Sequence, residues 1–523
     1  MTSSVKELPA SGQGAGGEGK PRGVDRVLSW IERAGNALPH PVVLFTALFV
    51  VVAVVSTALA LADVSVTVPG TEDTQHVSGL LTGEGVRWLV ENLVTNFAGF
   101  PPIAAVLLMI MAVGVAEKAG LLETAMRATL ARAPRAFLPY LVALVACQAH
   151  MMSDVAAIVL PPLAAVVFKS AGRHPAAGLI GGFACVTAGY AAGFTIGSLD
   201  ALYTGITQKA VDVLPASHHA DVNILANYFF TASSSLVLGL LGGFLISRVL
   251  EPRLPAHEPD DDAAADDIRL TSAQRRGLLF TALTVVAYAA VVLSLWLPVG
   301  APLRGDGGAL VPSPLLSGIV PVLFGAFLLA GMVYGFTVKT LSGSEGVVTA
   351  MTDSVKNMAG YVVMMFVAAQ VIAVFNWSNL GVLLAVKAAA FLESIGLTGF
   401  GALVAFVLLV SCLNMVVISG SALWSLIGPV FVPAFMLLGM NPALSQAAFR
   451  IGDSATAVIT PMNPYVFLLL ALLQRYEPEA RLGTLISRLA IFVVPFLVVW
   501  LGILAVFYGF GLPLGPGADI GLK

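Results

Sequence analysis

SALWSLIGPVFVPAFMLLGMNPALSQAAFRIGDSATAVITP, residues 421–461, is mostly apolar and yet carries Arg450 and Asp453 three residues apart. A charged side chain at the centre of a membrane-spanning helix costs about 2.5–3.5 kcal/mol on insertion scales, so such residues usually face a cavity, an ion or a partner. The four prolines of the stretch predict broken helices, which lipid tolerates only where the freed backbone is buried in protein or lines a cavity. We interpret the stretch as half of a transport site; the alternative is a kinked helix with a structural Arg–Asp pair.

The composition places the whole chain in a membrane. Of its 523 residues 58% are hydrophobic and only 11% are charged, whereas soluble domains are about 25% charged. The net charge of −3 and the lack of a basic tract argue against a nucleic-acid partner. No Walker, HExxH or GxSxG motif occurs, and the three cysteines have no metal-ligand spacing. We therefore expect a polytopic, all-α membrane protein that is not an enzyme and that has no cofactor beyond a coupling ion.

Apolar runs predict nine membrane spans and two re-entrant hairpins, because a span needs about 20 apolar residues. The run at 137–168 is too short for two spans and too polar at its centre for one, so a hairpin with its tip at Ser153–Asp154 fits best. A second run at 400–440 is broken at Asn414 and at Gly420–Ser421. The predicted spans lie near 41–62, 101–115, 175–193, 227–246, 278–297, 315–338, 360–375, 447–473 and 485–510.

Lysines and arginines concentrate on one side of this topology, which predicts a cytoplasmic N-terminus and an extracytoplasmic C-terminus. The chain then divides into seven segments. These are a cytosolic tail (1–40), a first span with an extracytoplasmic loop (41–95), a first repeat with hairpin 137–168 (96–247), an acidic cytosolic loop (248–276), connecting spans (277–356), a second repeat with hairpin 400–440 (357–511) and a C-terminal tail (512–523).

Three short matches that recur in the same order indicate an internal repeat. They pair Asn96-Phe-Ala-Gly-Phe100 with Asn357-Met-Ala-Gly-Tyr361, the Ser153–Pro161 spacing with Ser421–Pro429, and Gly172-Arg-His-Pro175 with Gly439-Met-Asn-Pro442. Five predicted spans lie between the start of the first copy and the start of the second, and an odd number inverts the second copy. The hairpins then enter from opposite faces and their tips meet near the middle of the membrane, as in secondary transporters with inverted repeats.

The first tip offers oxygen ligands for a coupling ion. Ser153 and Asp154 supply a hydroxyl and a carboxylate, and Gly197-Ser-Leu-Asp200 predicts a break in the neighbouring helix. Carboxylate, hydroxyl and carbonyl oxygens suit Na⁺, and a carboxylate that takes up a proton suits H⁺ coupling equally well. The alternatives are a helix N-cap facing the cytosol for Asp154 and a position at the membrane surface for Asp200.

The second tip offers groups for an aromatic anion. We expect Asn414, Ser421 and Trp424 to converge, with Arg450 and Asp453 on the adjacent broken helix. Arg450 would form a bidentate pair with a substrate carboxylate, and Trp424 would stack on a ring or a cation. Gly452 and Asp453 would mirror Gly197 and Asp200 as a second cation or proton site. The alternatives are an anchor at the membrane interface for Trp424 and an ion pair with Asp453 alone for Arg450.

At these residues the chain resembles the AbgT family of p-aminobenzoyl-glutamate transporters and antimetabolite exporters. The resemblance runs from about Gly35 to about residue 511. Its most specific pieces are Asn96–Pro102, Val113–Glu117, Gly172–Pro175, Gly205–Gln208, Asn376–Leu380, Ser421-x-x-Trp424, Gln446–Ser454 and Ile459–Pro461.

The resemblance implies a homodimer of protomers with nine spans and two hairpins. It implies ion-driven transport of p-aminobenzoyl-glutamate, p-aminobenzoate or sulfonamide-like aromatics. Two departures concern the tips: Val155-Ala-Ala follows the first Ser-Asp where the family has Ala-Gly-aromatic, and Gly420-Ser-Ala-Leu-Trp lacks the lysine that often precedes the tryptophan. The family's functional positions fall on Asp154, Asn414, Ser421, Trp424, Pro442, Arg450, Asp453 and Pro461.

The leading hypothesis is a secondary transporter of the bacterial inner membrane with elevator-type alternating access. Arg450 would hold the anionic group, Trp424 the ring, and Asp154 and Asp453 the coupling cation, with Na⁺ expected at Ser153, Asp154 and Asp453 if sodium is that ion. A Na⁺-coupled dicarboxylate importer on the related two-hairpin architecture is the alternative, although its usual Ser-Asn-Thr tips are absent. An intramembrane enzyme is a third hypothesis, and no paired-aspartate motif supports it.

Overall fold

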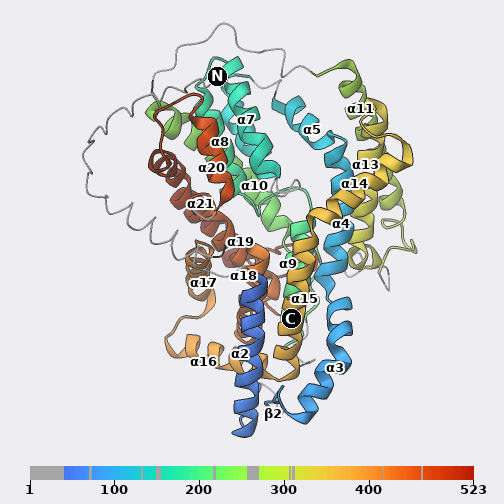
Figure 1. Ribbon diagram of the computed structural model, residues 1–523, viewed down its shortest axis with the longest axis vertical. Coiled ribbons are helices and arrows are strands. Elements are labelled where there is room, and N and C mark those ends of the chain that lie inside the picture. The colour runs from blue at the N-terminus through green and yellow to red at the C-terminus, as the bar shows by residue number, and fades with distance from the viewer. Residues whose placement is uncertain are drawn as a thin grey trace, which may run out of the picture.

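The computed structural model describes most of the chain between residues 41 and 522 (Figure 1). The first predicted tip, with Ser153 and Asp154, lies outside the described residues, as does Pro461. The described ranges are 41–69, 74–130, 134–148, 155–215, 220–255, 270–305, 308, 313–415, 417, 419–460 and 463–522.

Long apolar helices form most of the described structure. Seven helical stretches in this part of the chain are long and apolar enough to cross a membrane, or eight if the pair Val362–Trp377 and Leu380–Ser394, bent by 75°, counts as one span. In the most apolar part of Val42–Leu61 only 22% of the residues are buried within the protein, and in that of Ser272–Ser294 only 11% are. Because apolar side chains left uncovered in this way are stable only in lipid, these helices confirm the membrane class that composition predicted.

Close helix packing builds one side of the molecule. There α4 (Pro101–Lys118) packs against α13 (Ile319–Val338) and α14 (Gly343–Asn357), and α11 (Ser272–Ser294) packs on α13 (Figure 1). A Cβ on Gly331 would lie 2.6 Å from the backbone nitrogen of Ala116, so only glycine permits the α4–α13 approach. Small residues at such contacts are the usual way in which helices associate in lipid. A salt bridge from Lys118 to Asp353 (2.9 Å) closes the end of this group.

The remaining helices complete the described structure. Along the chain they are α2 (Pro41–Leu61), α3 (Gly83–Ala98), α5 (Leu121–Leu130), α6 (Leu138–Gln148), α7 (Val155–Ser170), α8 (Pro175–Ala188), α9 (Ser198–Val211), α10 (Tyr228–Phe244), the π-helix η3 (Leu245–Leu250), the 3₁₀ turn η4 (Glu251–Arg253), α12 (Pro314–Ser317), α15 (Ala359–Trp377), α16 (Leu380–Ser394), α17 (Gly399–Asn414), α18 (Gly420–Leu437), α19 (Pro442–Ala455), α20 (Pro464–Leu473) and α21 (Leu482–Phe510).

Two stretches outside the predicted spans contain more regular structure than expected. The region 63–95, predicted as a polar loop, contains the antiparallel strands β1 (Ser65–Thr67) and β2 (Thr74–His76) as well as most of α3. The fold is therefore not strictly all-α. The unpredicted α14 has too many polar residues to resemble a span. At α3 the polar composition indicated a loop, although the bond from the Gly85 amide to the Thr82 hydroxyl (3.2 Å) caps the start of a helix.

The two broken helices have matching construction. Both α8 and α19 begin with a proline, at Pro175 and Pro442, and both have an N-cap side chain that accepts from the second helical amide, His174 in α8 and Asn441 in α19. Each stops after 14 residues, followed by an irregular segment and a further helix, α9 or α20. Proline at the first helical position and a capping residue before it explain why both helices start where they do.

Helix order also recurs along the chain. The series α4 to α10 and the series α15 to α21 each contain seven α-helices, and their fourth members, α7 and α18, carry two internal prolines each. The second predicted break is confirmed, because α17 ends at Asn414 and α18 begins at Gly420. At about 1.5 Å per residue, the 11 residues of α6 and the 16 of α7 span less than a bilayer core of about 30 Å.

Chain segments after the last helix of each series tie down the loop before α8 or α19. In the first series the Arg173 guanidinium, just before α8, donates to the Glu251 carboxylate in η4. Nε of Arg173 lies 3.3 Å from Oε1 of Glu251. In the second, the Asn441 amide donates to the Ile520 carbonyl (2.9 Å), and the Leu522 amide to that of Gly439 (3.1 Å). The predicted C-terminal tail is therefore packed onto the protein rather than being free of it.

Candidate functional site

A cavity of about 410 Å³ lies where the broken helices meet α4 and α18. Pockets that hold small molecules are typically about 300–1,000 Å³. Among the lining residues in the described part of the chain, Asp453 is the one with a carboxyl group, and none is a lysine, arginine or histidine. The lining is formed by Val106, Ile110, Ala157, Val186, Thr187, Tyr190, Ser198, Leu199, Leu202, Tyr203, Met358, Ser419, Gly420, Ser421, Asp453, Ala457, Asn463 and Tyr465.

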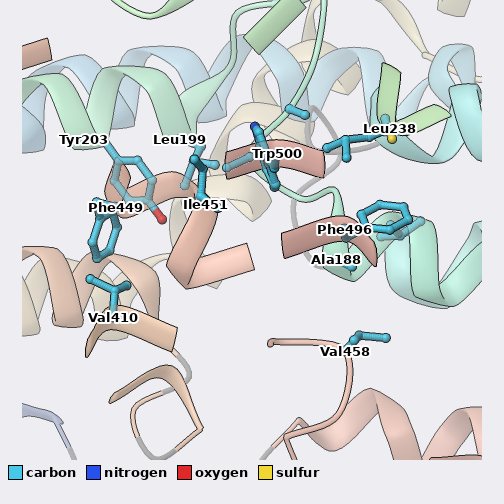
Figure 2. Close-up of a cluster of buried hydrophobic side chains, with 14 of the residues drawn as sticks. Ala188, Leu199, Tyr203, Leu238, Val410, Phe449, Ile451, Val458, Phe496 and Trp500 are labelled. Carbon is cyan, nitrogen blue, oxygen red and sulfur yellow. The ribbon is translucent and has the colours of Figure 1, made fainter. Parts of the chain in front are cut away.

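Asp453 and Tyr203 form the polar centre of this wall. The Tyr203 hydroxyl donates to Oδ2 of Asp453 at 2.7 Å, and the two residues are 0% and 5% exposed. Figure 2 shows the Tyr203 ring beside Phe449, in an edge-to-face contact with centroids 5.2 Å apart. Aromatic pairs prefer this geometry, which fixes the phenol so that its hydroxyl holds the carboxylate at the cavity.

Arg450 points elsewhere, to the start of α9. Its Nη2 lies 2.7 Å from Oδ1 of Asp200, and the other carboxylate oxygen of Asp200 accepts from the Gly197 amide at 2.9 Å. The guanidinium also lies over the Tyr203 ring, 5.2 Å from its centroid, and only 2% of Arg450 is exposed. Arg450 is not a lining residue of the cavity. Its predicted contact with a substrate carboxylate stays a prediction and requires this ion pair to open.

The alternative of an ion pair between Arg450 and Asp453 alone is wrong, because the salt bridge joins Arg450 to Asp200 and links α19 to α9. The idea that Gly452 and Asp453 mirror Gly197 and Asp200 also fails. Gly197 and Asp200 open α9 after its break, whereas Gly452 and Asp453 lie in the last turn of α19 before its break. The sequence pairing misled because Gly and Asp flank both breaks, but on opposite sides.

Gly452 has a packing role. A Cβ there would lie 2.6 Å from Cβ of Val410 and 2.7 Å from the Val407 carbonyl oxygen. Glycine therefore lets α19 approach α17 closely. Because the two helices are close, Asn414 at the end of α17 reaches the end of α19. Its side-chain amide donates to the backbone carbonyl of Asp453 and, at 3.2 Å, to the Thr456 hydroxyl. Asn414 thus caps the end of α19 and is not among the described lining residues.

Trp424 is fully buried in α18. Its indole nitrogen donates to the Thr207 hydroxyl at 3.0 Å, and its ring packs on Phe449 with centroids 4.5 Å apart. The alternative of an anchor at the membrane interface is therefore wrong. Its predicted stacking on a substrate ring stays a prediction, because the indole is covered by protein on the α9 and α19 sides.

Ser421 is the predicted substrate residue that does line the cavity, together with Asp453. Its hydroxyl lies 3.1 Å from that of Ser419, the N-cap of α18. Pro442 is buried at the start of α19 and serves to begin that helix. Ser153, Asp154 and Pro461 fall outside the described residues, so of the three residues expected to hold Na⁺ only Asp453 is described, and the Na⁺ site stays a prediction. Within the described ranges no group of three or more His, Cys, Asp and Glu side chains could hold a metal ion.

Sequence reasoning missed Tyr203, Ser198, Ser419 and Asn463 as cavity residues. A usable signal existed for two of them. Ser419 and Asn463 are N-caps, directly before α18 and α20, and capping residues after an apolar run indicate where a broken helix restarts. Tyr203 carries no such signal, since a tyrosine within an apolar helix looks like any core aromatic residue.

Gly420→Ala is expected to reduce transport strongly. A Cβ on Gly420 would lie 2.3 Å from the Tyr203 hydroxyl and 2.5 Å from Oδ2 of Asp453, so the pair must separate or α18 must shift. The matched control is Gly360→Ala near the start of α15, where a Cβ would meet nothing within 4 Å. Initial rates in proteoliposomes, normalised to the amount of folded protein, should fall at least tenfold for Gly420→Ala alone. Equal rates for the two variants would contradict the contact.

Known proteins give this geometry its context. The chain matches the AbgT transporter family over residues 26–522. It is 37% identical over 515 residues to the p-aminobenzoyl-glutamate transport protein of Escherichia coli (strain K12), covering 98% of this chain and 99% of that protein. Relatives of this kind are transporters rather than enzymes.

Two solved structures are similar over almost their whole length. The YdaH transporter of Alcanivorax borkumensis, reported to have an unusual topology, aligns with a TM-score of 0.86 at 37% identity, covering 91% of this chain and all of that one. MtrF of Neisseria gonorrhoeae, reported to illuminate a class of antimetabolite efflux pumps, aligns with a TM-score of 0.89 at 37% identity, covering 94% of this chain and all of that one. Identity at this level over this length leaves one reading: the chain belongs to the AbgT family of membrane transporters.

Proposed function

We propose that the protein is a secondary active transporter of p-aminobenzoyl-glutamate or related aromatic carboxylates and sulfonamide-like antimetabolites. The observation that carries the proposal is a cavity of about 410 Å³ with the Asp453 carboxylate in its wall, in a chain 37% identical end to end to a p-aminobenzoyl-glutamate transport protein. The apolar lining suits a benzene ring, and the hydroxyl groups on the cavity wall suit its polar substituents.

The topology we propose has nine spans and two re-entrant hairpins in an inverted repeat. Seven of the spans would be α2, α4, α10, α11, α13, α15 and α21, and the other two would be the broken pairs α8–α9 and α19–α20. Neither member of a broken pair reaches 18 residues, so each pair would need both of its helices to cross the membrane. The recurring helix order and the paired internal prolines support this topology.

An ion gradient would drive the cycle. We propose Asp453 as one site for the coupling Na⁺ or H⁺, because it is the carboxylate that reaches the cavity, and Asp154 as the other. Asp200 would act through Arg450, whose release would offer a guanidinium to the substrate carboxylate. The hairpin-bearing helices would move as an elevator against the α4–α11–α13 side of a homodimer. We place the protein in the bacterial inner membrane, with its N-terminus in the cytoplasm and its C-terminus outside.

Flux in proteoliposomes tests the proposal. Labelled p-aminobenzoyl-glutamate and p-aminobenzoate should move under a Na⁺ gradient or a pH gradient imposed separately, and one of the two should suffice. Asp453→Ala should abolish gradient-driven flux, whereas Asp353→Asn, which alters an exposed salt bridge on α14, should leave it intact. Flux of succinate without flux of either aromatic compound would instead support a dicarboxylate importer.

A further inference from the structure

One carboxylate oxygen of Asp453, a residue that lines the cavity, has no hydrogen-bond donor among the described residues and is not fully buried. Its Oδ2 is taken by the Tyr203 hydroxyl, and no group of the described residues donates to Oδ1. Asp453 is only 5% exposed, and it lines the cavity. A buried carboxylate is costly unless donors surround it, so this oxygen calls for a donor supplied from within the cavity.

Near Asp453 the described cavity wall has no free positive charge that could bind an anionic group. The one guanidinium nearby, that of Arg450, is paired with Asp200, and Asp453 is the one carboxyl residue on the described wall. An aromatic carboxylate entering with its acid group toward Asp453 would bring two like charges together. The opposite end of the ligand must therefore face Asp453, and that end should carry a hydrogen-bond donor.

From these contacts we infer that Asp453, positioned by Tyr203, recognises the arylamine group of the transported compound. The inference rests on the proposed function, in which Asp453 also takes up the coupling ion, so the amine and that ion would occupy Asp453 in different steps of the cycle. Aminobenzoyl compounds and sulfonamide-like compounds differ in their acid end but share an aromatic NH₂ group, so one carboxylate at the amine end would accept the whole class. Tyr203 is a positioning residue here: by donating to Oδ2, it leaves Oδ1 directed at the ligand.

The walls beside Asp453 suit the ring that carries the amine. Val106, Ile110, Met358, Leu199 and Leu202 line the same cavity, so most of its wall is apolar. A donor that meets a charged acceptor in such surroundings contributes about 1.5–3 kcal/mol, or at least tenfold in affinity. Sites built this way reject an analogue that lacks the donor.

A pair of ligands matched in size provides the decisive measurement. Isothermal titration calorimetry of the full-length protein in nanodiscs would compare 4-aminobenzoate with 4-methylbenzoate, and 4-aminobenzoyl-glutamate with 4-methylbenzoyl-glutamate. The methyl group fills the space of the amine without a donor. The expected result is about tenfold tighter binding of each amine, even though the methyl analogues are the more hydrophobic.

Variants then assign the preference to Asp453. Asp453→Ala should bind both members of each pair equally, and should bind 4-methylbenzoate at least as tightly as the native protein, because the buried charge is gone. Asp453→Asn keeps the size and a neutral acceptor, so it should keep about a threefold preference. Asp353→Asn, on the surface of α14, should keep the full preference.

The outcomes separate this inference from the proposed function. Equal native affinity for amine and methyl compounds would overturn the arylamine site while leaving transport of aromatic carboxylates in place. A tenfold preference that survives in both Asp453 variants would overturn the assignment to this residue. Failure of the native protein to bind either 4-aminobenzoyl compound or either methyl analogue would overturn the proposed function itself.

Discussion

Arg450→Met is expected to lower the free energy of unfolding by about 3–5 kcal/mol, and Asp200→Asn in the same chain to restore most of it. The single change leaves the Asp200 carboxylate buried with one remaining donor, the Gly197 amide. The double variant removes both charges, and the asparagine oxygen still accepts from that amide. Two buried charges are each costly alone and tolerable together, so the double variant should resemble the native protein more than either single one does.

Thermal unfolding of the purified variants in one detergent would measure these differences. Lys118→Met is the matched control, since it breaks a salt bridge whose side chains are 54% and 39% exposed. Exposed pairs contribute about 0–1 kcal/mol, so this variant should unfold close to the native temperature. If the double variant were as unstable as Arg450→Met, the loss would come from packing of the arginine side chain and not from an unpaired charge.

The same double variant separates two roles of Arg450. Its stability should return, but its transport should not, because the proposed cycle needs a guanidinium that leaves Asp200 for the substrate. Recovery of both would show that the pair only fastens α19 to α9. A transport assay on a variant of normal stability therefore tests what a single Arg450 substitution cannot, since the single change lowers stability and function together.

The charged pair shows where sequence reasoning stops. Arg450 and Asp453 lie three residues apart on one helix, a spacing that usually brings side chains together. In the structure each has a partner on α9 instead, Asp200 for the arginine and Tyr203 for the aspartate. Helix spacing is local and visible in the sequence, whereas the distance from α19 to α9, some 250 residues earlier, depends on how the two helices cross.

Helix breaks were predicted well for a physical reason. Glycine, proline and capping residues act through their own backbone, so Gly420, Pro442 and Gly197 mark the starts of α18, α19 and α9 directly in the sequence. Long apolar helices are equally plain, because lipid requires a minimum length. Side-chain partners and the polar helices outside the membrane carry no such local requirement, and these are the features that the sequence missed.

Trp424→Ala is expected to cost about 3–5 kcal/mol of stability, as is usual for removing a buried aromatic side chain. The indole is 0% exposed and packs between Phe449 and Phe406, with centroid distances of 4.5 Å and 6.5 Å. Trp424→Phe keeps a ring in this stack and loses the bond to Thr207, so it should cost far less. Its loss from the missing hydrogen bond alone should be about 1 kcal/mol.

Trp500→Phe is the comparison for the hydrogen bond between Trp424 and Thr207. Trp500 is also 0% exposed, but its indole nitrogen has no hydrogen-bond partner among the described residues. The excess loss in Trp424→Phe over Trp500→Phe then sets an upper limit on the contribution of the Thr207 contact, because Trp500→Phe also removes a buried donor without a partner. Thermal unfolding of both variants measures it.

Transport by Trp424→Phe decides how the indole is used. If Trp424 supports α18 against α9 from behind the cavity, phenylalanine should retain most of the flux per folded molecule, since a ring still fills the space. A stack on the substrate would need the indole to turn away from Phe449 and break its bond to Thr207 (3.0 Å) in every cycle. Normal stability with flux reduced at least tenfold would show that it does so, and would return Trp424 to the substrate site.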